Sequence, residues 1–274
     1  MRSEGEAMHF VVCAKQIPDP ETPPSAFRVD EAKKEVIPPQ GIAPVLSQFD
    51  GIAAEAALRI KEQTSGTRIT VISLGQERAR DAIKQVLAMG ADEGVLLDDA
   101  TFQGGDSYTT ARTLAAAIRK LGDVDAVFCG RQAADWDMGQ VGLGIAELLG
   151  WPCAIIASSV QCAEGKLTVK RVLADGFETV RVPLPAVVTV SNELGEPRYP
   201  KLQQIMQAAR KTVRSMTPAE LALDPSTVGA AGARLKLERL FVPVAGGDCE
   251  FMPGDTPQAQ AVALAKTLRA ARIL

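Results

Sequence analysis

Short apolar runs alternate with helical patterns through the first two-thirds of the chain. Runs of strand length are apolar almost throughout at residues 9–14, 68–74, 94–97, 124–129 and 186–190. Strands that are buried on both faces of a sheet show such near-continuous apolar stretches. The pattern therefore predicts a parallel sheet with both of its faces covered.

Helical periodicity fills the intervals between these runs, at residues 51–63, 76–89 and 106–121. In the second of these, Ile83, Val86 and Leu87 fall on one apolar stripe. Asp106 suits the N-cap position of the third. The alternation of strands and helices predicts an α/β fold with right-handed crossovers.

Three segments depart from this alternation. Residues 19–48 are rich in proline and charge, which predicts a hairpin excursion or a loop. Residues 160–182 predict short antiparallel strands, with turns at residues 164–166 and 175–176. Residues 191–255 show little periodicity, and so long a segment without it is usually functional or lies against a partner.

The end of the chain predicts a helix. Thr256 suits the N-cap and Pro257 the first helical position, and Val262, Ala265 and Leu268 form an apolar stripe. Such a stripe is difficult to bury on a finished domain. We therefore expect this helix to belong to an arm that contacts a partner.

Composition argues against several classes of function. The net charge is -3, so nothing indicates a surface for nucleic acid or for an anionic membrane. Aromatic residues make up 4% of the chain, which argues against platforms that stack single-stranded nucleic acid. No apolar run reaches the length of a membrane helix, and residues 1–8 do not form a signal peptide.

Cysteine and histidine usage narrows the chemistry further. The five cysteines are odd in number and form no C-x-x-C pair, which indicates reduced thiols and a cytoplasmic protein. His9 is the only histidine, so a metal site of several histidines is excluded and we expect no metal. The sequence contains no recognisable catalytic constellation.

The stretch "GRQAADWDMGQVGLGIAELLG", residues 130–150, joins the fourth apolar run to a helix pattern. In α/β sheets, ligands bind outside the carboxyl ends of the strands. A helix start there offers free N–H groups to a phosphate, with Gly139 permitting close approach and Gln140 donating an amide. Asp135 and Asp137 would repel a phosphate and suit a helix cap or a ribose hydroxyl. A capped turn without a ligand remains the alternative.

The stretch "LPAVVTVSNELGEPRYPKLQQIMQAARK", residues 184–211, resembles the signature region of the electron-transfer flavoprotein beta subunit, the family that includes FixA. The preceding "VKRVLADGFETVRV" extends the likeness. Counterparts also exist for "VVCAKQIPDP", "SQFDGIAAEAALRIKE", "VLAMGADEGVLL" and "GRQAADWDMGQVG". Several motifs in the family's order make this resemblance specific.

The resemblance implies an electron carrier rather than an enzyme. In this family the beta subunit pairs with an alpha subunit, and the FAD that carries the electrons is bound mainly by the alpha subunit. The pair carries electrons from acyl-CoA and related dehydrogenases, as in fatty acid oxidation, to a quinone reductase or another acceptor. The beta subunit has a Rossmann-like, adenine-nucleotide-binding α/β fold, here with a small antiparallel excursion and a C-terminal arm. It holds AMP as a structural nucleotide, or a second FAD in electron-bifurcating members.

Carried over position by position, the resemblance places the nucleotide beside Cys13, Ser47, Gln48, Phe49, Asp50, Leu74, Asp135, Asp137, Met138, Gly139, Gln140, Val141, Gly142, Leu143 and Ala146. Members with a second FAD commonly read "DGDTAQVGP" where this chain reads "DWDMGQVGL". The missing threonine and proline favour AMP. The alternatives are a bifurcating subunit whose own FAD oxidises NADH, and a stand-alone adenylate-binding regulatory protein.

The resemblance also predicts a loop that recognises dehydrogenase partners, with Leu194, Glu196, Arg198 and Tyr199. An exposed leucine in a partner's pocket makes physical sense as an anchor, and the alternative is that Leu194 folds onto its own domain. Arg198 and Tyr199 are expected to hold the base of the loop. The predicted organisation is an α/β domain at 1–190, the loop and its following helix at 191–211, and a C-terminal arm at 212–274.

Overall fold

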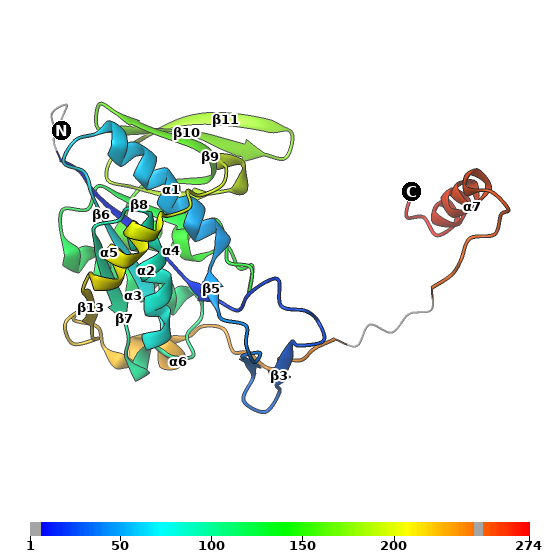
Figure 1. The fold of residues 1–274 in the computed structure, drawn as a ribbon, viewed down its shortest axis with the longest axis horizontal. Helices are drawn as coiled ribbons and strands as arrows, with labels where there is room; N and C mark the ends of the chain where they lie inside the picture. Colours follow the sequence, from blue (N-terminus) through cyan, green and yellow to red (C-terminus); the bar gives the residue numbers. More distant parts are fainter. Residues whose placement is uncertain (1–6, 244–248) are drawn as a thin grey trace.

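A nine-stranded sheet forms the centre of the protein, in a computed structural model that describes residues 7–243 and 249–274 (Figure 1). The strand order is β11-β10-β9-β12-β8-β1-β6-β7-β13. These strands are β1 (His9–Cys13), β6 (Arg68–Leu74), β7 (Glu93–Leu97), β8 (Ala126–Gly130), β9 (Cys153–Ala163), β10 (Lys166–Leu173), β11 (Gly176–Pro183), β12 (Ala186–Val190) and β13 (Val213–Met216). The pairs from β9 through to β13 are parallel, while β10 pairs antiparallel with β9 and with β11.

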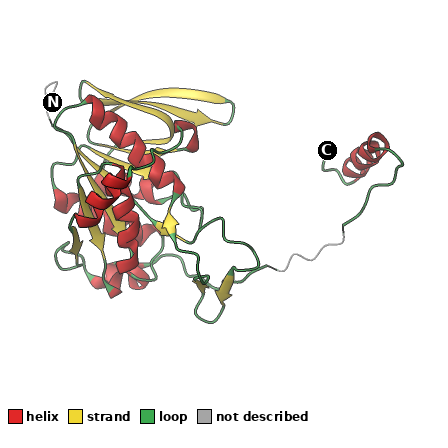
Figure 2. Cartoon of the chain, viewed as in Figure 1, coloured by secondary structure: helices red, strands yellow, loops and turns green. Residues whose placement is uncertain are grey.

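Helices cover both faces of this sheet (Figure 2). One face carries α1 (Gln48–Gln63), α2 (Arg80–Met89) and α5 (Leu202–Arg210), and the other carries α3 (Ser107–Leu121) and α4 (Val141–Leu149). Successive residues of a strand point to opposite faces. Phe10 and Val12 of β1 accordingly join the core on the α1 side, and Val11 and Cys13 join the core on the α3 side.

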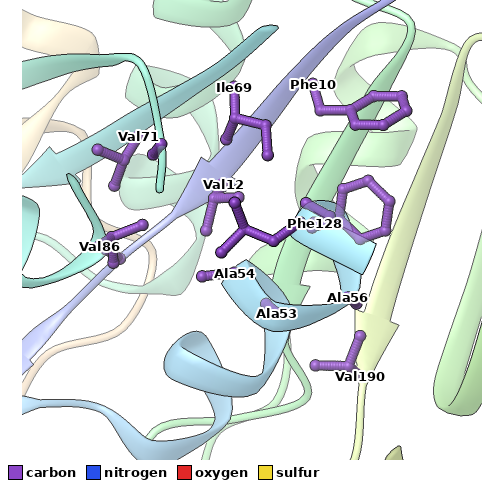
Figure 3. Close-up of a cluster of buried hydrophobic side chains, with 14 of the residues drawn as sticks. Phe10, Val12, Ala53, Ala54, Ala56, Ile69, Val71, Val86, Phe128 and Val190 are labelled. Atoms are coloured by element: carbon purple, nitrogen blue, oxygen red, sulfur yellow. The ribbon is translucent and has the colours of Figure 1, made fainter. Parts of the chain in front are cut away.

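The core on the α1 side is built from small helix residues over larger strand residues (Figure 3). Ala53 and Ala56 of α1 face β1 and β8, where the rings of Phe10 and Phe128 pack edge to face with centroids 5.4 Å apart. Small residues on the helix let its backbone approach the sheet closely. This close approach places the beginning of α1 at the carboxyl ends of these strands.

The predicted α/β fold is confirmed. The strands at residues 68–74 and 186–190 match their predicted bounds. The third helix begins after Asp106, which forms a capping box with Thr109, as its cap position predicted. Two boundaries differ, because α1 begins three residues early at Gln48 and a 3₁₀ turn, η1 (Glu77–Ala79), precedes α2.

The two predicted excursions are present. Residues 19–48 form the antiparallel hairpin β3 (Arg28–Asp30) and β4 (Glu35–Ile37), with β2 (Gln16–Ile17) paired to β5 (Val45–Leu46). The predicted antiparallel strands are longer than expected, because β9 begins at Cys153. Its first part pairs with β12, so the antiparallel strands extend the main sheet.

The predicted arm boundary at residue 212 is wrong. Residues 213–216 form β13, which pairs parallel with β7 at the edge of the sheet. The short elements that follow are η4 (Pro225–Thr227) and α6 (Gly229–Gly232), while η2 (Ala100–Phe102) and η3 (Asn192–Leu194) lie earlier in the chain. The α/β domain therefore extends beyond the boundary that the sequence predicted.

Residues 234–241 lie along the domain before the chain leaves it. The Asp106 carboxylate accepts hydrogen bonds from the backbone N–H groups of Arg234 and Leu235, at 2.7 and 2.9 Å. The Arg234 guanidinium stacks over the Tyr108 ring, and the Lys34 ammonium donates to the Leu237 carbonyl at 2.8 Å. These contacts fix where the arm begins.

The last helix, α7 (Pro257–Ala270), begins where Thr256 and Pro257 predicted. The Thr256 hydroxyl accepts the Ala259 N–H at 3.2 Å. None of the α7 residues is buried, and the helix stands apart from the sheet in Figure 1. Within the described residues, none of the helices combines the length and the apolar character that a bilayer crossing requires.

Truncation separates the arm from the domain. Removing residues 256–274 deletes no buried side chain, so we expect the free energy of unfolding of the α/β domain to change by less than about 0.5 kcal/mol. Removing residues 213–274 instead deletes β13 from the sheet, and this should lower the free energy of unfolding markedly. Urea titrations of both truncated chains measure the difference, and equal destabilisation by both would contradict this division.

Candidate functional site

The strand order reverses between β1 and β8. From β1 the chain proceeds outward through β6 and β7, and it then returns to place β8 on the other side of β1. The connections after β1 and β8 therefore leave in opposite directions, and α/β proteins bind ligands at such a point. We call the carboxyl ends of β1 and β8, with the segments that follow them, the switch point.

Asp50 joins the two strands at the switch point. Its carboxylate accepts the Lys15 N–H at 2.8 Å and the Gly130 N–H at 3.0 Å. Lys15 follows β1 and Gly130 ends β8, while Asp50 lies in the first turn of α1. The Ser47 N–H donates to the Lys15 carbonyl at 2.9 Å. The beginning of α1 is thus bonded to both strand ends.

Burial raises the pKa of Asp50 to about 7, against the opposing effect of the two backbone N–H groups and the Lys15 charge. The side chain is 8% exposed. A buried carboxylate is stable in its charged form only when hydrogen-bond donors of the protein replace the water molecules that it has lost. The protonation of Asp50 therefore changes near neutral pH, where the strength of the bridge changes with it.

The loop after β8 is held by its own aspartates. The Lys15 ammonium lies 2.7 Å from the Asp135 carboxylate, and the Gln132 amide donates to Asp137 at 2.9 Å. Asp137 and Gly139 adopt left-handed backbone, with φ of 49° and 61°. Neither aspartate caps α4, whose N-cap is Gln140 without a side-chain hydrogen bond. The first N–H groups of α4 are therefore open to an anion.

Two glycines bring the beginnings of the helices close to the sheet. A Cβ at Gly142 would lie 2.6 Å from Cγ2 of Thr189 on β12. A Cβ at Gly130 would lie 2.6 Å from the Asp50 carboxylate and 2.7 Å from the Phe49 Cβ. Neither position tolerates a larger residue without a shift. The N-terminus of α4 and that of α1 are both fixed by this contact with the strands.

The predicted nucleotide residues lie at strand ends or helix beginnings around the switch point. Cys13 ends β1, Leu74 ends the neighbouring β6, and residues 47–50 begin α1. The buried members are Cys13, Ser47, Asp50, Gly142 and Ala146; the exposed members are Gln48, Asp135, Asp137, Met138, Gln140 and Leu143; Phe49, Leu74, Gly139 and Val141 are half-buried. The fold thus gathers the predicted residues around the switch point and the uncapped beginning of α4.

Sequence reasoning missed Lys15 and Arg131 at this site. Lys15 pairs with Asp135, and Arg131 lies over the Phe49 ring with 5.4 Å to its centroid. Lys15 lies two residues after β1 and Arg131 directly follows β8, and these positions at strand ends were the available signal. Beneath them, the neighbouring Cys13 thiol and burial raise the pKa of the Cys129 thiol. Cys129 is therefore a neutral part of the core.

We call residues 192–200, for which the resemblance predicts contact with a partner, the partner loop. The expectation that its leucine is exposed is wrong, because Leu194 is 8% exposed and packs into the core on the α1 side. Its carbonyl accepts a hydrogen bond from Arg59 at 3.1 Å. The partners of Leu194 come from distant parts of the chain, which the local pattern does not reveal. Its folding onto its own domain was the stated alternative.

Ion pairs hold the base of the partner loop on α1. The Arg198 guanidinium lies 2.7 Å from the Glu55 carboxylate and also pairs with Glu62. Glu55 also pairs with Arg59 at 2.9 Å. These cations lower the pKa of Glu55 against the effect of its burial. Arg198 thus fixes the loop as predicted, whereas Tyr199, expected to do the same, is 92% exposed.

A family comparison decides the assignment. A family model described as the electron transfer flavoprotein domain matches residues 36–221. This chain belongs to the electron transfer flavoprotein family. The match runs from within β4 to the turn after β13, and so includes the β8 side of the switch point and all of the partner loop. The resemblance noted in the sequence is confirmed.

Curated relatives of the electron transfer flavoprotein family cover nearly the whole chain. The beta subunit of the electron transfer flavoprotein of Thermoanaerobacterium thermosaccharolyticum is 38% identical over 92% of this chain and 95% of its own. CarD, a subunit of the caffeyl-CoA reductase-Etf complex of Acetobacterium woodii, is 35% identical over 97% and 100%. FixA of Azorhizobium caulinodans is 33% identical over 94% and 92%. The chain is accordingly a beta-type electron-transfer subunit.

Replacing Asp50 with asparagine tests the bridge through its pH dependence. The Asp50 pKa of about 7 in the folded chain lies above the ordinary value of an unfolded aspartate, about 4. Its contribution to stability is therefore full below about pH 4 and is lost as the pH rises through about 7. We expect the free energy of unfolding of wild type, relative to D50N, to fall as the pH rises from about 5 to 8.

Denaturant titrations across that range measure the difference in the free energy of unfolding between wild type and D50N. Its slope against pH should correspond to the uptake or release of no more than one proton. Asp81→Asn, which removes an exposed acid from the first turn of α2, is the matched control and should follow wild type. Parallel curves for wild type and D50N would show that Asp50 does not titrate in this range.

Proposed function

We propose that this chain is the beta subunit of a heterodimeric electron-transfer flavoprotein and holds an adenine nucleotide at the switch point. The observation that carries the proposal is the uncapped beginning of α4, pressed onto the sheet at Gly142 beside the Asp50 bridge. Backbone N–H groups there would bind the phosphate. Asp135 and Asp137, engaged with Lys15 and Gln132, would border the ribose.

AMP is the first candidate for this nucleotide. It rests on the loop "DWDMGQVGL", residues 135–143, which lacks the threonine and the proline common in members with a second FAD. In this case the nucleotide is structural. Electrons then pass only through the FAD held mainly by the alpha subunit.

FAD is the second candidate, favoured by the names of two relatives. CarD belongs to a caffeyl-CoA reductase complex, and a subunit of Anaerotignum propionicum, 32% identical, to an acryloyl-CoA reductase. A reductase passes electrons toward its substrate, so its flavoprotein needs an entry point for them. A FAD in the beta subunit that oxidises NADH would supply one.

The arm is proposed to bind the alpha subunit. Leu235, Phe241 and Phe251 expose large apolar side chains along its lead-in, and Val262 and Leu264 do so on α7. Exposed apolar surface on this scale indicates an interface. The proposal predicts that the chain lacking residues 256–274 loses the alpha subunit while its α/β domain stays folded.

The partner loop and the beginning of α5 are proposed to contact an acyl-CoA-type dehydrogenase or reductase. A quinone reductase or another acceptor would then receive the electrons from the flavoprotein. Tyr199 and Leu202 are 92% and 73% exposed, and Met206 continues this surface. Glu196 lies beside them in the loop. Leu194 acts from within by supporting the loop.

The co-purified heterodimer tests the nucleotide directly. We expect one adenine nucleotide in addition to the alpha FAD, released by denaturation and identified by chromatography. One FAD and one AMP per heterodimer, without rapid reduction by NADH, would support AMP. Two FAD and rapid reduction by NADH would establish the second candidate. A heterodimer with one FAD and no second nucleotide would contradict a nucleotide site at the switch point.

Gly142→Ala tests where the phosphate binds. The added methyl would meet Thr189 and lift the beginning of α4 from the sheet. We expect the bound nucleotide to dissociate about tenfold more readily, which corresponds to about 1.4 kcal/mol. Glu147→Ala, an exposed position on the same helix, is the control. Dialysis followed by nucleotide analysis measures the loss, and equal retention by G142A and E147A would place the phosphate elsewhere.

Paired substitutions test the partner surface. Tyr199→Ala with Leu202→Ala should slow electron delivery from the native dehydrogenase about tenfold and leave stability unchanged. Leu194→Ala should lower the free energy of unfolding by about 2–5 kcal/mol, because it deletes a buried leucine. Stopped-flow kinetics and denaturant titration give the two readouts. Slowed delivery by L194A at unchanged stability would show that Leu194 itself docks.

A further inference from the structure

A cavity lies away from the switch point. Its volume is about 470 Å³, and it is bounded by α3 from Arg112 onward, the end of α4 and residues 220–223 after β13. The nine residues of α4 separate it from the nucleotide loop. A helix of that length spans about 13 Å, so the two sites do not overlap.

Cations from α3 line this cavity. Arg119 and Lys120 lie seven and eight positions after Arg112, which places all three on one side of the helix. None of the three forms an ion pair within residues 7–243 and 249–274. The Nε of Arg112 is buried and finds no hydrogen-bond partner among the described residues. A buried donor without an acceptor is costly, so the protein itself leaves this guanidinium incompletely bonded.

The acidic group of the lining is already engaged. The Glu220 carboxylate accepts the Thr217 N–H at 2.7 Å and the Thr217 hydroxyl at 2.9 Å, and these bonds lower its pKa. Arg119 donates to the Leu148 carbonyl at the end of α4. Arg112 and Lys120 also line the cavity, and their charges contribute to the lowered pKa values of Asp224 and Glu220, respectively. Its lining therefore carries an excess of positive charge.

The remaining lining is apolar. It consists of Ala115, Ala116, Leu148, Leu221, Ala222 and Leu223. The volume falls within the range of about 300–1,000 Å³ that is usual for small-molecule sites. We propose that this cavity binds a small organic anion, with its oxyanion at Arg112 and Lys120 and its aliphatic body against Leu148, Leu221 and Leu223. The site is independent of the nucleotide at the switch point.

Calorimetric titration of the assembled heterodimer, with its nucleotide bound, tests this proposal. The probes are hexanoate, hexan-1-ol and inorganic phosphate. We expect saturable hexanoate binding with one site per chain, and binding of the alcohol and of phosphate at least about tenfold weaker. The alcohol lacks the oxyanion and phosphate lacks the aliphatic body, so each loses one half of the contacts.

Arg112→Gln and Lys120→Gln should each weaken hexanoate binding about tenfold or more. Lys166→Gln, which removes an exposed cation on β10 outside the cavity, should leave it unchanged. Nucleotide content should stay at the wild-type value in all three variants. No saturable hexanoate binding, equal binding of phosphate, or no effect of either substitution at the cavity would overturn the proposal.

Discussion

The carboxylate of Asp50 joins two strands whose following segments leave the sheet in opposite directions. Its bonds to Lys15 and Gly130 span the point at which the strand order reverses. Hydrogen bonds to a buried charged acceptor are stronger than ordinary ones, and losing them leaves the charge without compensation. The position of α1, of the loop after β8 and of the beginning of α4 all depend on this contact.

The same helix also fixes the partner loop. Asp50 lies at the beginning of α1, and Glu55 and Glu62 farther along it bind Arg198. Arg59 of α1 holds the Leu194 carbonyl. One rigid element therefore positions both the loop proposed to hold a nucleotide and the loop proposed to meet dehydrogenases. A shift at one end of α1 would be felt at the other.

Local patterns explain what the sequence predicted. Central strands are apolar on both faces, and the third and last helices begin at Asp106 and Thr256 because a cap is a local interaction. β13 escaped prediction because it is a four-residue edge strand with Arg214 and Ser215 exposed. Lys15 and Asp135 lie 120 positions apart, so no local pattern in the sequence predicts their pairing. Such contacts arise only when the fold brings strand ends together.

The arm separates folding from assembly. Because α7 contributes no buried residue to the α/β domain, that domain does not need α7 in order to fold. Without a partner, the chain carries an unprotected apolar tail, and exposed termini are preferred sites of proteolysis. A surplus copy is consequently more vulnerable than an assembled one. Under the proposed assembly, this asymmetry would give the cell a means of matching the amounts of two subunits without regulating their synthesis.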